Sequence, residues 1–148
     1  MSGALLVLVH AASTLFMTGL IWFVQIVHYP LAAAVGAEAF VAYQQAHMER
    51  TSWVVGPPML VEAAAAVLMC WRVPRGVPPE LAWLGLGLLV LVWISTAVFQ
   101  VPLHTTLLLG HDDATISKLV RSNWVRTVLW SLRSGVAVWM VWLAWRST

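Results

Sequence analysis

The residues that could do chemistry are histidines, a glutamate and arginines set among strongly apolar segments. His28, His47 and His104 come from separate segments, and Glu62 lies within another. Neutral imidazole can bind a transition metal or transfer a proton near neutral pH. With Glu62, these histidines offer nitrogen and oxygen ligands suited to iron, copper, zinc or manganese. Acid–base or polar roles without a metal, and simple packing, stay open, because no His-x-x-x-His or Glu-x-x-His spacing is present.

Ionisable side chains in apolar segments need partners. An arginine or carboxylate near the centre of a bilayer costs about 2.5–3.5 kcal/mol on insertion scales, and such residues face the bundle interior or a wet cavity. We therefore expect Glu62 to lie within salt-bridge or water-bridge distance of Arg126 or Arg133. A structural ion pair is one interpretation of this pairing. A site in which the charges also bind or activate a molecule is the other.

Polar residues recur at helical spacing in the apolar segments and run toward one end. Thr18, Gln25 and His28 follow i, i+7 and i+10, and a similar stripe ends at His104. We expect these stripes to meet in one cavity. The candidate site residues are His104, Glu62 and Arg126 for catalysis, Gln100, Asn123, Trp130 and Arg133 for substrate binding, and His28, His47, Glu62 and His104 for a metal.

The composition requires a membrane to surround these elements. The chain has 148 residues, of which 61% are hydrophobic and 9% charged, and its mean hydropathy is +0.83. Soluble domains carry about 25% charged residues. We predict an integral membrane protein, in the cytoplasmic membrane if the source is bacterial, with the lipid bilayer as its main partner. The net charge of +2 is scattered, which argues against nucleic-acid binding. Cys70 is the single cysteine, so neither an internal disulfide nor a cysteine-based metal site is expected.

Four apolar runs are long enough to cross a bilayer, since a spanning helix needs about 20 residues. We place them at residues 4–29, 52–71, 81–103 and 124–145, which predicts an all-α, four-transmembrane-helix bundle forming a single domain over residues 1–148. No basic region precedes the first run, so we expect it to be retained and not removed as a signal peptide.

The connections between the runs are unequal. A short Pro-rich turn at 72–80 lies on one membrane face, whereas two loops of about twenty residues, 30–51 and 104–123, lie on the other. We predict a short amphipathic helix in the first long loop, with Tyr43 and His47 on one side, and a break or kink at Gly56-Pro57-Pro58. Positive charges are nearly equal on the two faces, so membrane orientation stays open, as does homo-oligomerisation.

Two short segments of the C-terminal half carry a resemblance to a known family. Val101-Pro102-Leu103-His104 ends the third span, and Asn123-Trp124-Val125-Arg126-Thr127 opens the fourth. Together they resemble the anthrone oxygenase-like family of small four-helix membrane proteins, whose members usually show Val-Pro-Leu-Asn and then Trp-Asn-x-x-Arg-Thr. The resemblance implies oxidation of anthrone-like molecules. His104 replaces the usual Asn, and Asn123-Trp124 reverses the usual order.

These observations lead to two functional hypotheses. The first is a membrane-embedded oxidoreductase or oxygenase that acts on a lipophilic phenol- or quinone-like molecule, with a base, a cation for the oxyanion and aromatic walls. A His/Glu-bound transition metal such as iron or copper, or a haem, is the cofactor considered. The second is a non-catalytic haem- or quinone-binding membrane subunit, an assembly factor or a small-solute permeation unit.

Overall fold

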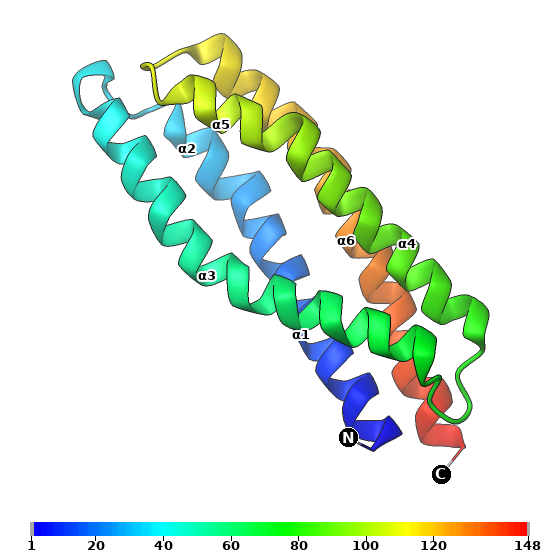
Figure 1. The fold of residues 1–148 in the computed structure, drawn as a ribbon. Coiled ribbons are helices and arrows are strands. Elements are labelled where there is room, and N and C mark those ends of the chain that lie inside the picture. Colours follow the sequence, from blue (N-terminus) through cyan, green and yellow to red (C-terminus); the bar gives the residue numbers. More distant parts are fainter. Residues whose placement is uncertain (1, 148) are drawn as a thin grey trace.

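The computed structural model describes residues 2–147 as a bundle of four long helical columns (Figure 1). Each column is apolar and long enough to cross a membrane. The predicted all-α four-helix architecture and the integral membrane location are therefore confirmed. In chain order the elements are α1 (Gly3–Phe23), the π-helical turn η1 (Val24–His28), α2 (Tyr29–Ala32), α3 (Ala37–Trp71), α4 (Pro79–Ser95), the π-helical turn η2 (Thr96–Gln100), α5 (Val101–Leu107) and α6 (Asp113–Arg146).

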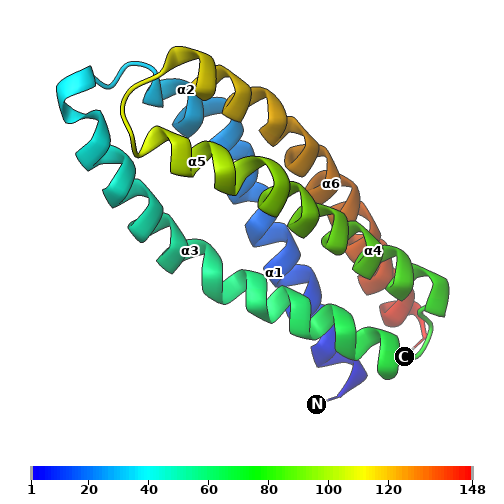
Figure 2. The ribbon, with the colours of Figure 1, turned by 45° about the horizontal axis from the view of Figure 1, so that its top comes forward.

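The connections and chain ends divide unequally between the two ends of the bundle. Both termini and the turn between α3 and α4 lie at one end, and α2 with the connection before α6 lies at the other (Figure 2). Gly76 allows the first turn to close, because it has a φ of 77° and an added Cβ would lie 2.6 Å from Ser147 Oγ. This separation of the connections agrees with the sequence.

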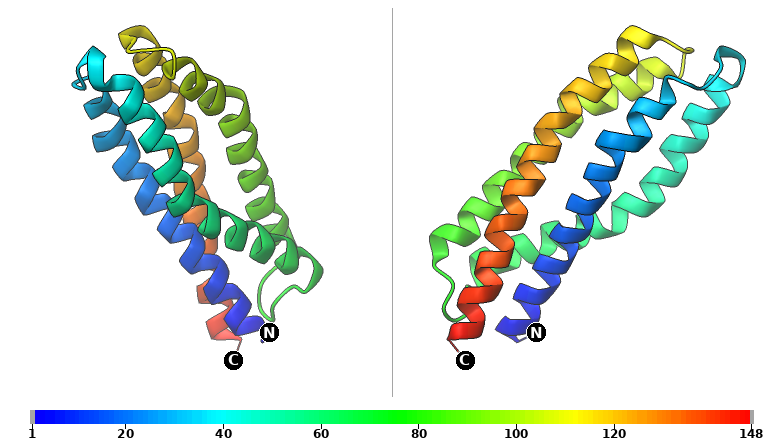
Figure 3. Two further views of the ribbon diagram at one scale, coloured as in Figure 1. Left: turned by 60° about the vertical axis from the view of Figure 1, so that its left-hand side comes forward. Right: turned by 180° about the vertical axis from the view of Figure 1, so that it is seen from behind.

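The third helix corrects the expected boundaries of the second span. The amphipathic segment around His47 is not a separate loop helix, because α3 runs without interruption from Ala37 to Trp71. Pro57 and Pro58 lie inside the helix, and the ribbon of α3 changes direction near its middle (Figure 3). A bend relieves the clash between a proline ring and the preceding turn without ending the helix. His47 and Glu62 therefore lie on the same continuous helix.

The last helix begins before the predicted membrane span, at Asp113. Asp112 caps α6 by accepting a hydrogen bond from the Thr115 backbone at 2.9 Å, and the Thr115 hydroxyl donates to the same carboxylate oxygen. These hydrogen bonds lower the pKa of the Asp112 carboxyl below its usual range. The cap allows the helix to form eleven residues before the apolar run starts at residue 124, so polar residues of the expected loop become helical.

Two π-helical turns precede prolines at matching places in the first and third columns. The turn η1 ends at His28, just before Tyr29-Pro30, and η2 ends at Gln100, just before Val101-Pro102. Proline lacks the N–H that would continue the helical hydrogen-bond ladder, and a π turn inserts one extra residue into the ladder. Side chains after each turn are therefore rotated relative to a regular helix, which affects where Tyr29 and His104 point.

Candidate functional site

Three histidines meet at the end of the bundle that holds the longer connections. His28 comes from η1, His47 from α3 and His104 from α5. His28 Nε2 lies 2.8 Å from His47 Nδ1, and the ring centroids of His47 and His104 are 5.2 Å apart. The predicted convergence of the three imidazoles is confirmed. Hydroxyls surround them, with Thr51 Oγ1 3.0 Å from His47 Nδ1 and Tyr43 Oη 3.4 Å from His28 Nε2.

A hydrogen-bonded chain joins this cluster to α6. Tyr29 Oη lies 2.9 Å from His104 Nε2 and accepts a hydrogen bond of 3.1 Å from Arg126 Nη2. Arg126 Nε donates to Asn123 Oδ1 at 2.9 Å, and Asn123 Nδ2 donates in turn to Gln25 Oε1 at 2.9 Å. Arg126 is thus held within the bundle by neutral oxygen acceptors.

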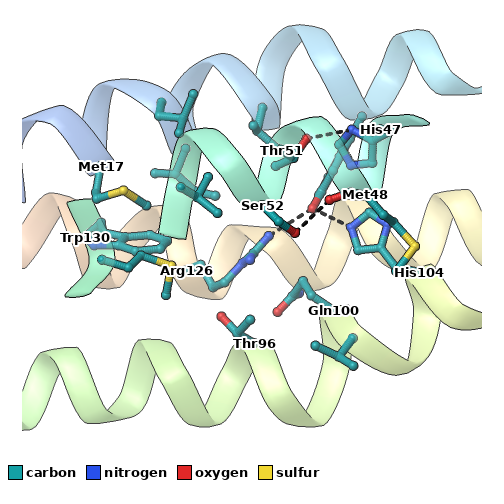
Figure 4. A pocket seen from close by; sticks show the side chains of 17 residues that line it. Met17, His47, Met48, Thr51, Ser52, Thr96, Gln100, His104, Arg126 and Trp130 are labelled. Carbon is teal, nitrogen blue, oxygen red and sulfur yellow. Dashed lines mark hydrogen bonds between the residues drawn. The ribbon is translucent and has the colours of Figure 1, made fainter. Parts of the chain in front are cut away.

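A cavity of about 210 Å³ extends from His47 and His104 toward Trp130 (Figure 4). Its polar end includes Tyr29, His47, His104 and Arg126, and Trp130 lies on its wall. The other lining groups are mostly apolar side chains of α1 and α3, with Thr96 and Gln100 of η2 and Val101 of α5 opposite. We call this space the histidine cavity; its lining consists of Met17, Leu20, Ile21, Val24, Tyr29, His47, Met48, Thr51, Ser52, Val55, Met59, Thr96, Gln100, Val101, His104, Arg126 and Trp130.

Glu62 belongs to a separate, deeper cluster. Its Oε1 accepts a hydrogen bond of 2.7 Å from Arg133 Nε, and both side chains are completely buried. Arg133 also donates to His10 Nε2 at 3.0 Å and to the Gly85 carbonyl oxygen. We call Glu62, Arg133 and His10 the deep ion cluster. The expected pairing of Glu62 with an arginine of the last span is confirmed.

Trp130 stands between the two sites. Its ring lines the histidine cavity, and its indole Nε1 donates a hydrogen bond of 3.3 Å to Glu62 Oε2. Glu62 and Arg133 do not line that cavity. The indole therefore forms a wall whose polar edge faces away from the cavity and toward the carboxylate.

The predicted site residues fall into three groups. His47, His104, Gln100, Arg126 and Trp130 line the histidine cavity. His28 and Asn123 lie behind it and contact its lining through hydrogen bonds. Glu62 and Arg133 lie in the deep ion cluster instead.

The four predicted metal ligands are not brought together in this conformation. Glu62 is bound to Arg133, while His104 has a hydrogen-bond partner at each ring nitrogen. Over residues 2–147, no group of three or more His, Cys, Asp or Glu side chains is arranged to hold a metal ion. The physical reason is depth, since Glu62 lies four turns along α3 from His47 and faces α6.

Two residues of the site were not among the candidates predicted from the sequence. Tyr29 links His104 to Arg126, and Gln44 Nε2 lies 2.9 Å from His104 Nδ1. Gln44 follows Phe40 by four residues, so it shares the inward side of that helix, and it is almost fully buried. The signal available in the sequence was a glutamine four residues after a phenylalanine on the apolar side of the predicted helix. Tyr29 gave no comparable signal, because its direction depends on η1.

Comparisons with known proteins do not assign a family to this protein, so its class is defined by the fold and the site. No protein-family profile, no curated protein and no solved structure matches this chain. The class that the fold defines is an integral membrane four-helix bundle.

Proposed function

We propose that this protein is a membrane-embedded oxidoreductase or oxygenase that binds a lipophilic phenol- or quinone-like molecule in the histidine cavity. The observation that carries the proposal is the make-up of the cavity. Apolar side chains line most of it, and Tyr29, His47, His104 and Arg126 lie next to one another in the lining. Small-molecule sites typically combine apolar walls with a few convergent polar groups.

The size and position of the cavity favour a small, flat ligand that arrives from the lipid. Pockets for drug-sized ligands usually have volumes of about 300–1,000 Å³, and this cavity measures about 210 Å³. That volume favours one to three fused rings over a haem macrocycle. Its lining includes exposed residues of α3 and α5, Ser52 and Val101, so a longer ligand could leave its tail in the bilayer.

The polar end supports proton removal and stabilisation of the oxyanion that results. His47 Nε2 has no hydrogen-bond partner among residues 2–147, and its ring lines the cavity, so it is our candidate base. Arg126 is our candidate for holding the negative oxygen. His104 takes a different role from the one expected, because Tyr29 and Gln44 occupy both of its ring nitrogens.

The proposed reaction class can be written with atoms balanced. An aromatic ketone with an activated CH₂ group binds as its phenol tautomer, whose hydroxyl loses a proton to the base, and the enolate oxygen is held by the arginine. The resulting carbanion adds dioxygen, and the product loses water. The sum is CH₂ plus O₂ giving C=O plus H₂O, so dioxygen supplies both the inserted atom and the oxidising equivalents. The resemblance to anthrone oxygenase-like proteins supports this direction.

A transition metal and the non-catalytic role remain alternative proposals. Iron or copper could bind at the histidines only after His28 and His47 exchange their mutual hydrogen bond for metal ligation. Elemental analysis of the purified protein tests this, and copurification of about one equivalent would support the metal. Binding of a phenol without oxygen uptake would support a quinone-binding subunit.

The deciding experiment measures oxygen uptake by the purified protein in lipid nanodiscs with a panel of one- to three-ring phenols and anthrone. We expect uptake with at least one compound, and its loss in His47→Gln and Arg126→Gln. His111→Gln is the matched control, because His111 lies in the connection before α6 and outside the cavity. Equal uptake by wild type and the His47 and Arg126 variants would contradict the proposal.

A further inference from the structure

We propose that the histidine cavity recognises a hydroxyl group on its ligand, which it binds as hydrogen-bond acceptor and donor at once. The inference rests on the proposed function, since it names the chemical group that the same cavity takes. It assigns ligand contacts to Tyr29, Arg126 and Gln100. His104 and Gln44 act through Tyr29 as positioning residues.

The position of the proton on His104 follows from its partners. Gln44 Nε2 donates to the backbone oxygen of His104 at 3.1 Å, which identifies this end of the amide as the NH₂ group. The same NH₂ lies 2.9 Å from His104 Nδ1. An NH₂ group can only donate, so Nδ1 accepts, and in a neutral imidazole the hydrogen is then on Nε2. His104 Nε2 therefore donates to Tyr29 Oη, 2.9 Å away.

Tyr29 consequently has a hydrogen left to donate. Its oxygen accepts from His104 Nε2 and from Arg126 Nη2, which uses both acceptor positions of the hydroxyl. No acceptor for the Tyr29 hydrogen is found among residues 2–147. Arg126 Nη1 likewise has no partner in that part of the chain. Because both residues line the cavity, the polar end offers a ligand two kinds of N–H or O–H donor.

Gln100 offers the opposite function. Its Nε2 donates to Ser122 Oγ at 3.0 Å, and the hydroxyl of Ser122 donates to the Leu119 carbonyl at 3.2 Å. This arrangement assigns Oε1 as the free end of the Gln100 amide. Oε1 is buried and has no hydrogen-bond partner among residues 2–147. Gln100 is only 1% exposed and is part of the cavity lining. Figure 4 shows Gln100 and Arg126 among the side chains that line this cavity.

A neutral hydroxyl satisfies both sides of this cavity. Its oxygen can accept from Tyr29 or Arg126, and its hydrogen can be donated to Gln100 Oε1. A carbonyl or a methyl ether can only accept, so it leaves Gln100 Oε1 desolvated and unpaired. An unpaired buried acceptor lowers affinity by about tenfold to a hundredfold. The cavity should therefore prefer a phenol or hydroquinone to the matching ether or quinone.

Two matched probes test this preference in nanodiscs, with empty nanodiscs as the blank for lipid partitioning. The probes are 2-naphthol and 2-methoxynaphthalene. We expect wild type to bind 2-naphthol about tenfold to a hundredfold more tightly than the ether. Gln100→Leu should weaken naphthol binding alone and bring the two affinities together. Tyr29→Phe should weaken both, because both ligands accept from Tyr29.

The role of His104 has its own readout. His104→Phe should weaken both probes as Tyr29→Phe does, and the double variant should be no weaker than either single variant, because one interaction is lost in all three. Additive losses would overturn the positioning role. Thr106→Val is the control, since Thr106 is exposed on α5 and only bonds to the Pro102 carbonyl.

The outcomes separate this inference from the proposed function. Equal affinity of wild type for the two probes overturns hydroxyl recognition but leaves a lipophilic binding site. Absence of binding of either probe overturns both. The wild-type comparison needs no variant to fold, so the inference stays falsifiable if Gln100→Leu is unstable.

Discussion

The histidine cavity and the deep ion cluster contain similar residue types and differ in what their polar groups contact. In the deep ion cluster, the nitrogens of Arg133 donate hydrogen bonds to Glu62, His10 and the Gly85 carbonyl oxygen. Glu62 also accepts a hydrogen bond from Trp130. Among residues 2–147, Gln100 Oε1 has no partner in the histidine cavity; His10 Nδ1 has none in the deep ion cluster, but His10 does not line that cavity. Charges satisfied by the protein fix its structure, whereas unsatisfied groups lining a cavity are free for a ligand.

Trp130 lies at the boundary between the two regions. The indole separates an accessible cavity from an ion pair with no exposed side-chain surface. Substitutions in the deep ion cluster should therefore mainly lower stability, whereas substitutions in the histidine cavity should mainly weaken ligand binding.

The largest expected effect comes from breaking the deep ion pair. Glu62→Gln leaves the Arg133 guanidinium buried without a counter-charge, which should lower the free energy of unfolding by about 3–5 kcal/mol. Adding Arg133→Met should recover part of this loss, because no charge then remains in the deep ion cluster. Thermal and denaturant unfolding in detergent measure both, and Glu38→Gln on the exposed start of α3 is the control. A Glu62→Gln protein as stable as wild type would remove the structural role from this cluster.

A smaller stability effect, with a larger functional one, is expected for Arg126→Gln. Asn123 Oδ1 loses its donor, which should cost about 1–3 kcal/mol. Phenol affinity or turnover should fall about a hundredfold, as when a donor to a developing oxyanion is removed. The comparison is with Arg121→Gln, an exposed arginine on the same helix. A stability loss larger than that of Glu62→Gln would reverse the distinction between the two regions.

Trp130→Phe tests the wall between them. Phenylalanine keeps an aromatic surface but cannot donate to Glu62, so the free energy of unfolding should fall by about 1.5 kcal/mol. Ligand affinity should change only slightly, which a titration with 2-naphthol measures. Trp139→Phe, at a half-exposed position on α6, controls for general loss of an indole.

The smallest effect is expected outside both regions, at the cap of α6. Folding lowers the pKa of Asp112 from its ordinary value of 3.8, so its contribution to stability is present above that value. The contribution should disappear as the pH falls through the lower pKa of the folded state. Unfolding temperatures of wild type and Asp112→Ala should therefore differ near pH 7 and converge in acid. Asp112→Asn, which keeps a capping oxygen but does not titrate, should differ from Asp112→Ala by an amount that does not change with pH.

Much of the architecture could be predicted from the amino-acid sequence because membrane insertion depends on summed properties of long segments. Four apolar runs and the Pro-rich turn determine four spanning columns, with the longer connections at one end. The cost of burying charge determines that Glu62 must meet an arginine, and the structure supplies Arg133. Helical spacing was enough to predict that His28, His47 and His104 converge.

Tertiary structure alone decided which of those polar groups share a cavity. Because α3 bends at Pro57 and Pro58 and continues, His47 and Glu62 lie on one helix at different depths in the bundle. The π turns before Pro30 and Pro102 altered the rotation of the following residues and brought Tyr29 Oη against His104. Such rotations depend on how whole helices pack and on single extra residues in their hydrogen-bond ladders. The periodicity of a sequence assumes a regular helix, and at these turns the helix is not regular.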